Sequence, residues 1–457
     1  MHFLNREQEK ALITGELGKP DSRLIVLYGR RRIGKSALLR QVLDDQVVYY
    51  LADINEAQVQ RSFFAAQVAD MIPGFDQPVY LDWNTLFRQM NQMLKRHITV
   101  MIDEFPYLVR SSPELPSVIQ KIIDLGQNSR FHLVLCGSSQ QMMQGLVLDR
   151  SAPLFGRAHR IIQLQPMRCK WLLQALQIDP AAAIEEYSVW GGIPRYWELR
   201  SEYASLNEAI RELVLDPYGI LHEEPLRLFM DDLRYAVQPF SISSLIGQGC
   251  NKLSEIAGRL NKPATSLNRP LQNMIATGYV KRDVCWGEKV KNSKKTLYRI
   301  LDPLSRFFFT FVVPNQSKLS SGHVDLVMDE IKSRWKLHVS ETWEELCRES
   351  VSHLEIDGHR FLPAQRWWQQ SRKQGSAEID LISESTDGSV LLVGEAKWQS
   401  RVRPESLLRD LDDKISCLDL SKKYDRVFKL LLLPGIKEKT EGDILWRNAE
   451  FVCSGPD

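Results

Sequence analysis

One short segment carries residue types that suit the binding of a nucleoside triphosphate. Residues 29–36 read Gly-Arg-Arg-Arg-Ile-Gly-Lys-Ser, directly after an apolar run, LIVLY, and directly before an apolar-periodic helical pattern. Glycines allow backbone N–H groups to wrap phosphates, a lysine supplies a cation to the outer phosphates, and a serine hydroxyl can hold Mg²⁺. The segment therefore predicts a P-loop that binds ATP through Gly29, Arg32, Gly34, Lys35, Ser36 and Ala37.

Two carboxylates at the end of a second apolar run would complete this site. Residues 98–104, ITVMIDE, end in Asp103 and Glu104. Asp103 is placed to orient Mg²⁺ together with Ser36, and Glu104 is placed to polarise the attacking water. After the next run, at 133–136, the hydroxyl of Ser138 is a candidate to contact the γ-phosphate or its water. The spacing predicts ATP hydrolysis, and an acidic pair that is merely solvated is the alternative.

A loop arginine could act on the same chemistry from outside the subunit. Arg157 ends the segment PLFGR at 153–157. A planar guanidinium in such a loop can stabilise transition-state charge in a neighbouring subunit, which would require a homo-oligomer. A surface or structural role for Arg157 is equally compatible with these residues taken alone.

These motifs and several others resemble one known group of proteins. The segments that look like the archaeal-type ATPases of the AAA+/STAND-related group are FLNRE (3–7), GRRRIGKS (29–36), DEFPYL (103–108), CGSS (136–139), PLFGR (153–157) and GGIPRYW (191–197). The resemblance implies that Gly34, Lys35, Ser36, Asp103 and Glu104 bind and hydrolyse ATP. It also favours the transition-state role of the loop arginine over the structural one.

A second set of charged residues lies near the C-terminal end. Residues 378–382, EIDLI, and 390–398, VLLVGEAKW, read as two adjacent strands joined by a polar turn. Because strand side chains repeat every second residue, we expect Asp380, Glu395 and Lys397 on one face. The carboxylates can hold Mg²⁺ or Mn²⁺, while Lys397 orients the nucleophilic water or stabilises the developing charge. Such a set suits phosphodiester hydrolysis.

A preceding helix, expected to end near residue 353, offers a further ligand to this metal. Glu344 is predicted to complete the site, with Glu345 as the rival. An acidic helix followed by EIDL and GEAKW resembles the PD-(D/E)XK nuclease superfamily, in the variant fused to archaeal-type ATPases. The resemblance implies a restriction-endonuclease-like fold that cleaves DNA. A solvent-facing salt bridge at Glu-x-Lys is the alternative, as is a nuclease-like fold that binds nucleic acid without cutting it.

Between the two sites, the pattern predicts a helix-turn-helix with a wing. A helix at 253–260 and a turn at 261–263 precede a second helix through Met274, with Pro270 as a kink, and then two strands flank a basic turn. The side chains expected to reach DNA bases or phosphates are Thr265, Ser266, Asn268, Arg269, Gln272, Lys289, Lys291, Lys294 and Lys295. A subunit contact or nucleotide lid is the alternative. Arg366, Trp367 and Trp368 are candidates to stack on bases, although core positions are commoner for such aromatic residues.

Four parts are needed to hold these residues. Apolar runs that alternate with helical patterns from Arg23 to Pro166 predict a parallel sheet covered on both faces. We expect an α/β protein with a P-loop ATPase core (1–166), a helical lid (167–235), a winged helix-turn-helix (236–314) and a restriction-endonuclease-like α/β domain (325–457). A polar linker after Pro314 would precede the last part, whose helix would begin near Asp329.

Composition narrows the class of protein. The 457 residues are 44% hydrophobic and 25% charged, as in folded globular chains. A net charge of +2 means that any nucleic-acid affinity must come from local patches. Seven cysteines without a CxxC pair favour a reducing cytoplasm over a disulfide framework, and no apolar run is long enough to span a membrane.

Together these patterns predict a cytoplasmic, homo-oligomeric ATPase whose nucleotide state controls a Mg²⁺-dependent module that cleaves DNA. A role in defence against foreign DNA would suit this pairing. The alternatives are a nucleotide-dependent DNA-binding regulator, and a STAND-like switch that recognises a protein partner. In both alternatives the C-terminal domain does not cleave.

Overall fold

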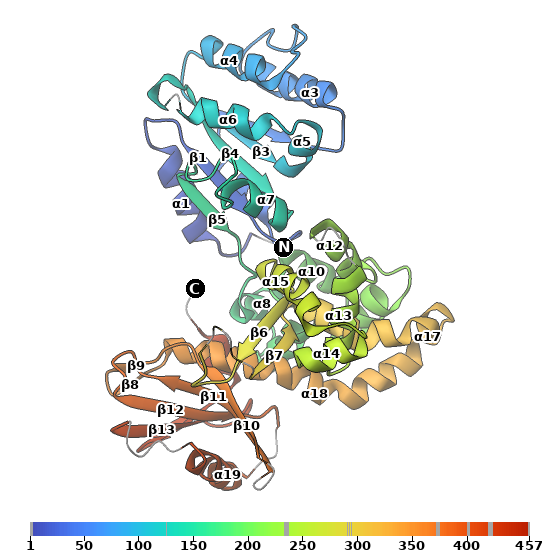
Figure 1. The fold of residues 1–457 in the computed structure, drawn as a ribbon, viewed down its shortest axis with the longest axis vertical. Helices are drawn as coiled ribbons and strands as arrows, with labels where there is room; N and C mark the ends of the chain where they lie inside the picture. The colour runs from blue at the N-terminus through green and yellow to red at the C-terminus, as the bar shows by residue number, and fades with distance from the viewer. Residues whose placement is uncertain are drawn as a thin grey trace. The chain divides into compact units, whose positions relative to one another are not determined.

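The computed structural model describes residues 3–124, 126–232, 237–289, 291, 293, 295–371, 375–399, 403–418 and 424–455 (Figure 1). The chain divides into two compact units, one of residues 1–166 with 193–195 and one of residues 167–192 with 196–457. Within the described part of the chain, no helix combines the length and apolar character that a membrane crossing needs.

The first unit is built on a five-stranded parallel sheet with the order β2-β3-β4-β1-β5. Its strands are β1 (Leu24–Tyr28), β2 (Val47–Leu51), β3 (Ile98–Asp103), β4 (Phe131–Gly137) and β5 (Arg160–Gln163). All residues of β1, β3 and β4 are buried, as expected for central strands covered on both faces. The parallel α/β arrangement predicted for this region is therefore confirmed.

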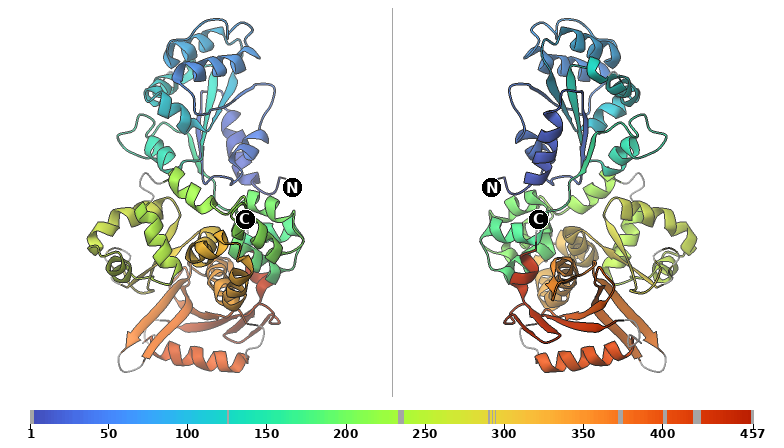
Figure 2. Two further views of the ribbon diagram at one scale, coloured as in Figure 1. Left: turned by 90° about the vertical axis from the view of Figure 1, so that its right-hand side faces the viewer. Right: turned by 90° about the vertical axis from the view of Figure 1, so that its left-hand side faces the viewer.

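Helices pack against this sheet (Figures 1 and 2). A large aromatic and aliphatic core is buried between the helices and the sheet. The helices are α1 (Glu7–Leu17), α2 (Lys35–Arg40), α3 (Ala57–Ala69), α4 (Trp83–Met93), α5 (Phe105–Ser111), α6 (Leu115–Asp124) and α7 (Gln140–Val147). Phe64 of α3 makes edge contacts with Trp83 and Phe87 of α4, which fixes these two helices against each other.

The second unit starts with helices and continues into a three-helix and hairpin segment. The first helices are α8 (Cys169–Leu176), α9 (Pro180–Trp190), α10 (Pro194–Arg200, of which residues 196–200 belong to this unit), α11 (Leu206–Ala209) and α12 (Glu224–Asp232). Next come α13 (Val237–Gly247), α14 (Leu253–Arg259), α15 (Asn268–Ala276) and an antiparallel hairpin of β6 (Val280–Val284) and β7 (Thr296–Ile300). This order of elements matches the order expected from the sequence.

The expected kink in the second helix does not arise. A 3-10 turn, Ala264–Leu267, precedes α15, which begins at Asn268. Pro270 therefore stands in the first helical turn, where the backbone N–H that proline lacks would have no intrahelical partner. The proline helps to start α15 rather than to distort it.

A long helix connects this segment to a six-stranded sheet. After α16 (Pro303–Phe307) and α17 (Gln316–Ser320), α18 runs from Val324 to Ser350. The polar stretch expected to be a linker is thus mostly helical: α17 packs on α18, and its Leu319 is buried. The helix expected to begin near Asp329 begins five residues earlier for the same reason, because both segments pack together.

The sheet has the order β10-β11-β12-β13-β15-β14 and is mixed. Its strands are β10 (Gln365–Ser371), β11 (Gly375–Glu384), β12 (Val390–Ala396), β13 (Arg426–Leu432), β14 (Lys439–Glu441) and β15 (Ile444–Arg447). β11 and β12 pair antiparallel, and β12 pairs parallel with β13. The helices α18 and α19 (Pro404–Ser416) both pack on β11 and β12, α20 (Ala449–Cys453) packs on α18, and β8 (Glu355–Ile356) pairs with β9 (His359–Arg360).

A buried histidine makes the stability of the second unit depend on pH. His338 of α18 packs among the rings of Phe307, Phe311 and Trp335, and its Nε2 lies 3.0 Å from the carbonyl oxygen of Ser188. Burial, and then the charge of Arg306, lowers the pKa of His338 to about 3. The imidazole therefore stays neutral in the folded chain at pH values where an unfolded chain protonates it.

We expect the free energy of unfolding of this unit to fall by about 2 kcal/mol between pH 7 and pH 5 through His338. The unfolded state binds the additional proton below its ordinary pKa of about 6.5, so stability is complete above that pH and is lost as the pH falls toward 3. Calorimetry at both pH values should show a smaller decrease in melting temperature for His338→Gln than for wild type. The exposed His323→Gln variant is the control, and equal decreases in all three proteins would contradict the assignment.

Candidate nucleotide and metal sites

The residues expected to bind the nucleotide gather at the carboxyl edge of the parallel sheet. The strands β3, β4 and β1 are neighbours and end at Asp103, Gly137 and Tyr28. Because parallel strands end on the same side, the loop after β1, the acidic pair after β3 and the serine after β4 adjoin one another. The topology thus brings together segments that are far apart in the sequence.

Two glycines shape the loop that precedes α2. A Cβ atom on Gly29 would lie 2.7 Å from the carbonyl oxygen of Leu164, so a side chain does not fit there. Gly34 has a φ of +98°, in the left-handed region that favours glycine, and it directly precedes Lys35, the first residue of α2. Backbone N–H groups at a helix N-terminus attract anions, so the loop and α2 have the arrangement that suits a phosphate.

The side chain of Lys35 lies against the backbone of the loop that precedes α2. Lys35 is buried, and its Nζ donates hydrogen bonds to the carbonyl oxygens of Gly29 at 3.0 Å and Arg30 at 2.9 Å. Arg32 has a φ of +68°, while Ser36 is half-buried and Ala37 exposed in the first turn of α2. A bound triphosphate would offer Nζ oxygens of higher charge than these two carbonyls.

The acidic pair is held by specific hydrogen bonds. Asp103 is fully buried, and its carboxylate accepts hydrogen bonds from the hydroxyl of Tyr49 at 2.7 Å and from the backbone N–H of Glu104 at 2.9 Å. The carboxylate of Glu104 accepts a hydrogen bond from Ser138 Oγ at 2.5 Å. The predicted base and the predicted γ-phosphate contact are therefore in direct contact with each other.

Tyr49 is a member of this site that sequence reasoning missed. It lies on β2, next to β3, and its register partner is Met101. Burial, and then the charge of Asp103, raises the pKa of Tyr49, so its phenol remains protonated and able to donate. The sequence shows tyrosine hydroxyls on an otherwise apolar strand, but only the order of the strands shows that the hydroxyl of Tyr49 reaches Asp103.

Arg157 lies at the opposite edge of the sheet from the P-loop of its own chain. It precedes β5, which runs parallel to β1, so it lies on the side where the strands begin. Its guanidinium binds both carboxylate oxygens of Asp124, at 3.0 and 3.2 Å, and the carbonyl oxygen of Pro153 at 3.2 Å. The full length of β1 separates it from its own phosphate loop, on the order of 20 Å with the flanking residues. This arrangement does not join Arg157 to its own site.

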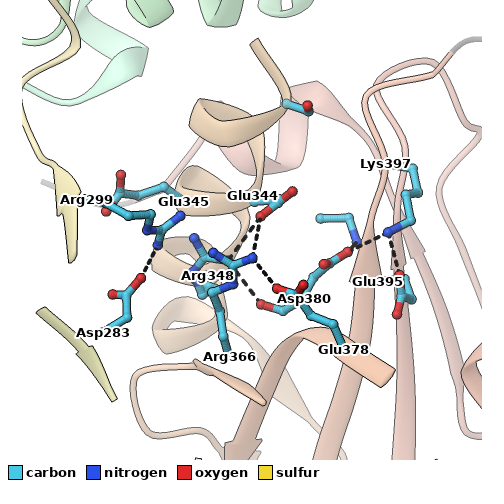
Figure 3. Close-up of polar contacts among 12 residues, drawn as sticks. Asp283, Arg299, Glu344, Glu345, Arg348, Arg366, Glu378, Asp380, Glu395 and Lys397 are labelled. Carbon is cyan, nitrogen blue, oxygen red and sulfur yellow. Dashed lines mark hydrogen bonds and ion pairs between the residues drawn. The ribbon is translucent and has the colours of Figure 1, made fainter. Parts of the chain in front are cut away.

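The C-terminal trio is brought together around one ammonium group. Lys397 Nζ lies 2.9 Å from Asp380 Oδ2 and 2.6 Å from Glu395 Oε2 (Figure 3). Asp380 also accepts a hydrogen bond from the backbone N–H of Ala396 at 3.0 Å, and Lys414 of α19 forms an ion pair with the other oxygen of Glu395. Carboxylates from β11 and β12 thus share one cation, close enough for a single metal ion to replace it.

The three groups affect each other's pKa in different directions. Burial, and then the charge of Asp380, raises the pKa of Glu395. For Asp380, burial is outweighed by the charge of Lys397 and by hydrogen bonds from Ala396 and Lys397, and its pKa is lowered. For Lys397, burial is outweighed by the two carboxylate charges, which raise its pKa. The ammonium form is therefore held firmly at neutral pH.

Glu344, rather than Glu345, faces this cluster. Glu344 Oε2 lies 3.8 Å from Arg348 and 3.8 Å from Arg366, and burial followed by the charge of Asp380 raises its pKa to about 7. Glu345 points toward the β6–β7 hairpin (Figure 3). It pairs with Lys281 at 3.0 Å. Although burial opposes it, the charge of Lys281 lowers the pKa of Glu345 to about 2.

The donor set fits a hard divalent cation in part. Asp380 and Glu395 supply carboxylate oxygens, and the buried Oε2 of Glu395 has the ammonium of Lys397 2.6 Å away, where a cation would lie. Mg²⁺ is commonly held by one or two carboxylates with water as its remaining ligands, so two suffice. The expected third ligand is not gathered with them: no three His, Cys, Asp or Glu side chains form a metal-holding group within the described ranges. Glu344 stays outside because the two arginines hold it.

The side chains expected to contact nucleic acid differ in their exposure to solvent. On α15 and the turn before it, Thr265, Ser266, Asn268, Arg269 and Gln272 are exposed, as are Lys289, Lys291 and Lys295 of the wing; Lys294 lies outside the described residues. Trp367 belongs to the core beside α19, so it is not available for stacking. Arg366 is held by Glu344 and Glu378, and Trp368 is half-buried.

Two family models match parts of the chain. Residues 3–198 match a family described as an ATPase domain predominantly from Archaea. Residues 308–408 match a family described as archaeal and bacterial proteins of unknown function. The chain is thus similar to archaeal ATPases over its first part and to a second, functionally undefined family over much of its last part.

One relative is similar over nearly the whole chain, and others over parts of it. An uncharacterised protein of Methanocaldococcus jannaschii is 28% identical over 471 aligned positions, which cover 97% of this chain and 98% of that relative. An uncharacterised ATP-binding protein of the same organism is 35% identical over 46 residues, 10% of this chain and 78% of that relative. The structure of a Walker-type ATPase of Pyrococcus abyssi is similar with a TM-score of 0.50 and 18% identity, over 67% of this chain and 96% of that one. At this identity the structural likeness shows the fold.

Proposed function

We propose that the chain hydrolyses ATP and cleaves DNA with Mg²⁺ under nucleotide control. In support, its first part is similar to an archaeal ATPase domain and much of its last part to a second family. The cleaving half of this proposal rests on Lys397, whose ammonium contacts the carboxylates of both Asp380 and Glu395. A lysine beside two metal-binding carboxylates supplies the charge that phosphodiester hydrolysis requires.

ATP hydrolysis would use the residues at the carboxyl edge of the first sheet. The N–H groups of the loop and of α2 bind phosphate oxygens, and Lys35 exchanges the two backbone carbonyls for the outer phosphates. Ser36 and Asp103 would hold Mg²⁺, which would neutralise phosphate charge. Glu104, positioned by Ser138, accepts a hydrogen bond from the attacking water.

DNA cleavage would use the cluster around Lys397. Asp380 and Glu395 would hold Mg²⁺, which polarises the scissile phosphodiester. Lys397 would then turn from the carboxylates to the attacked phosphate. Water adds to phosphorus, the bond from phosphorus to one sugar oxygen breaks, and a proton of the water passes to that oxygen. Glu344, with a pKa of about 7, can take up a proton or become a further ligand once it leaves its arginines.

The proposed function predicts cleavage that depends on metal and responds to nucleotide. The protein would be incubated with supercoiled, linear and single-stranded DNA and with RNA, each with Mg²⁺ or Mn²⁺ and with or without ATP. We expect DNA products only with metal, at a rate that ATP changes. Cleavage that ignores nucleotide would refute the coupling, and intact DNA under all conditions beside active ATP hydrolysis would refute the nuclease half.

A DNA-binding regulator that does not cleave is the second candidate. It is favoured by the two lysines that occupy Glu395 and by the separation of Glu344 from the other carboxylates. In that case ATP should change the affinity for DNA, and DNA should remain intact with every metal. Binding and cleavage measured on the same fluorescent substrate distinguish the two functions.

We further propose that Arg157 acts on the nucleotide of a neighbouring subunit in a homo-oligomer. Arg157→Ala should lower steady-state phosphate release at least tenfold while ATP binding is retained, because transition-state charge loses its cation. Mixing it with Lys35→Ala, which lacks a working P-loop but keeps Arg157, should restore part of the activity. Arg160→Ala is the matched control, since Arg160 also pairs with a carboxylate, Glu16, in this unit. A mixture no more active than Arg157→Ala alone would contradict action between subunits.

A further inference from the structure

A groove of about 1040 Å³ separates the α14–β7 segment from the first two strands of the C-terminal sheet. One wall is formed by α14, α15 and the β6–β7 hairpin, and the other by β10 and β11. Neither the nucleotide site nor the Lys397 cluster contributes its main residues to it. The groove is therefore a separate feature whose lining indicates its ligand.

One wall of the groove is basic. Lys252, Arg282 and Lys295 line it, and the two lysines are 44% and 55% exposed. The lysines pair with Glu255 at 3.5 Å and Glu288 at 3.3 Å, which are surface ion pairs that a phosphate can replace at little cost. On the opposite wall Glu378 is bound by Arg366, so its charge is balanced. The lining therefore suits a polyanion.

The groove also offers an aromatic face and two amides. Trp368 of β10 lines the groove and is half-buried. The thiol of Cys285 donates to the backbone carbonyl oxygen of Trp368 and accepts from its backbone N–H, both at 3.4 Å. The backbone N–H of Trp286 donates to the carbonyl oxygen of Arg366 at 2.8 Å, which ties the hairpin to β10. Asn268 and Gln272, one turn apart on α15, are exposed along the same groove. A fixed ring and amide groups are what unstacked bases bind.

The geometry favours a single strand over a duplex. An α-helix with its side chains is about 10–12 Å across, and the major groove of B-DNA is about 12 Å wide, so a reading helix must enter alone. The face of α15 that carries Asn268 and Gln272 instead looks across the groove at β10 and β11. A duplex would collide with that second wall, whereas a single strand fits between the two.

We propose that this groove binds a single strand of nucleic acid, with a base on Trp368, base edges on Asn268 and Gln272, and phosphates on Lys252, Arg282 and Lys295. The inference deepens the proposed function, on which it rests for the fate of the strand. Glu378 precedes Asp380 by two positions on β11, about 7 Å along the strand, so the groove leads toward the Lys397 cluster. Binding itself requires neither nucleotide nor metal.

The first test measures binding of the full chain to fluorescein-labelled oligonucleotides by anisotropy, in EDTA and without nucleotide. We expect single-stranded DNA to bind at least tenfold more tightly than the matching duplex. The double variant Lys252→Ala/Lys295→Ala should make the slope of log affinity against log salt shallower by about 1.4, because two phosphate contacts are lost. Lys332→Ala/Lys439→Ala removes two lysines that are likewise paired with nearby carboxylates, and should leave the slope unchanged.

The second test addresses the aromatic contact. Trp368→Ala should weaken single-strand binding by about 5- to 150-fold, and Trp368→Phe should recover part of it. Because Trp368 also packs against the core beside α19, the exposed Gln272→Ala variant provides a second, structurally mild probe that should weaken binding too. An RNA oligonucleotide of the same sequence shows whether deoxyribose or ribose strands are preferred.

Equal affinities for duplex and single strand, or salt slopes unchanged by loss of the two groove lysines, would overturn the groove assignment. Single-strand binding through the groove by a protein that never cleaves would support it while refuting the nuclease half of the proposed function. Cleavage that is unaffected by the groove variants would refute the groove assignment and support the nuclease half of the proposed function.

Discussion

Lys397→Met should abolish Mg²⁺-dependent DNA cleavage, by on the order of a thousandfold, while phosphate release from ATP and DNA binding remain within about twofold of wild type. Methionine preserves most of the length and the apolar stem of lysine but removes the ammonium that contacts Asp380 and Glu395. Loss of one preorganised charged donor at a reacting centre typically costs two to three orders of magnitude in rate.

The same substitution should leave the metal site occupied. With the ammonium removed, the carboxylates lose a competitor for a divalent cation, while Glu395 keeps its ion pair with Lys414. We therefore expect Mn²⁺ to bind Lys397→Met at least as tightly as wild type by calorimetry. Tight metal binding without cleavage would assign Lys397 to the chemical step rather than to assembly of the site.

Lys429→Met is the matched control for this prediction. Lys429 lies on β13, next to β12, and pairs with Asp412 of α19 at 2.5 Å, so its loss removes a similar ion pair from the same sheet. Cleavage by Lys429→Met should remain near wild type. Substantial cleavage by Lys397→Met, or equal losses in the two variants, would contradict a specific role for Lys397.

Local sequence sufficed to predict this cluster because its members are close along the chain. β11 and β12 are joined by a short turn, and their antiparallel register places Leu381 opposite Gly394. A period of two then puts Asp380 near Glu395 and Lys397. The position of Glu344 depended instead on how α18 packs across the sheet. Arg348 and Arg366, which hold Glu344 away from the other carboxylates, could not be identified from spacing.

The same distinction separates what could and could not be predicted in the first unit. The P-loop and the acidic pair each lie within one strand and the turn after it, so sequence patterns identify them. The contact between Tyr49 and Asp103 depends on β2 lying beside β3, which follows from the order of the whole sheet. Likewise, Cys285 contacts the backbone of Trp368, a residue that lines the groove, across more than eighty residues of sequence.

Glu104→Gln should reduce steady-state ATP hydrolysis about a thousandfold and leave ATP binding intact. Glutamine can still accept the hydrogen bond from Ser138, so the local geometry is preserved, but its amide cannot take the proton of the attacking water. Lys35→Ala should instead lose ATP binding. The control is Glu114→Gln, which changes an exposed carboxylate just before α6. Similar rates for Glu104→Gln and Glu114→Gln would rule out Glu104 as the base.

Glu104→Gln also separates ATP binding from ATP hydrolysis in the control of cleavage. If bound ATP is sufficient to set the state of the C-terminal domain, cleavage by this variant should respond to ATP as in wild type and keep that response for the whole reaction. If each round of hydrolysis is required, ATP should no longer change its cleavage rate. A wild-type protein that binds ATP but releases no phosphate would favour a nucleotide switch, because Glu104 would then remain bound to Ser138 rather than activate water.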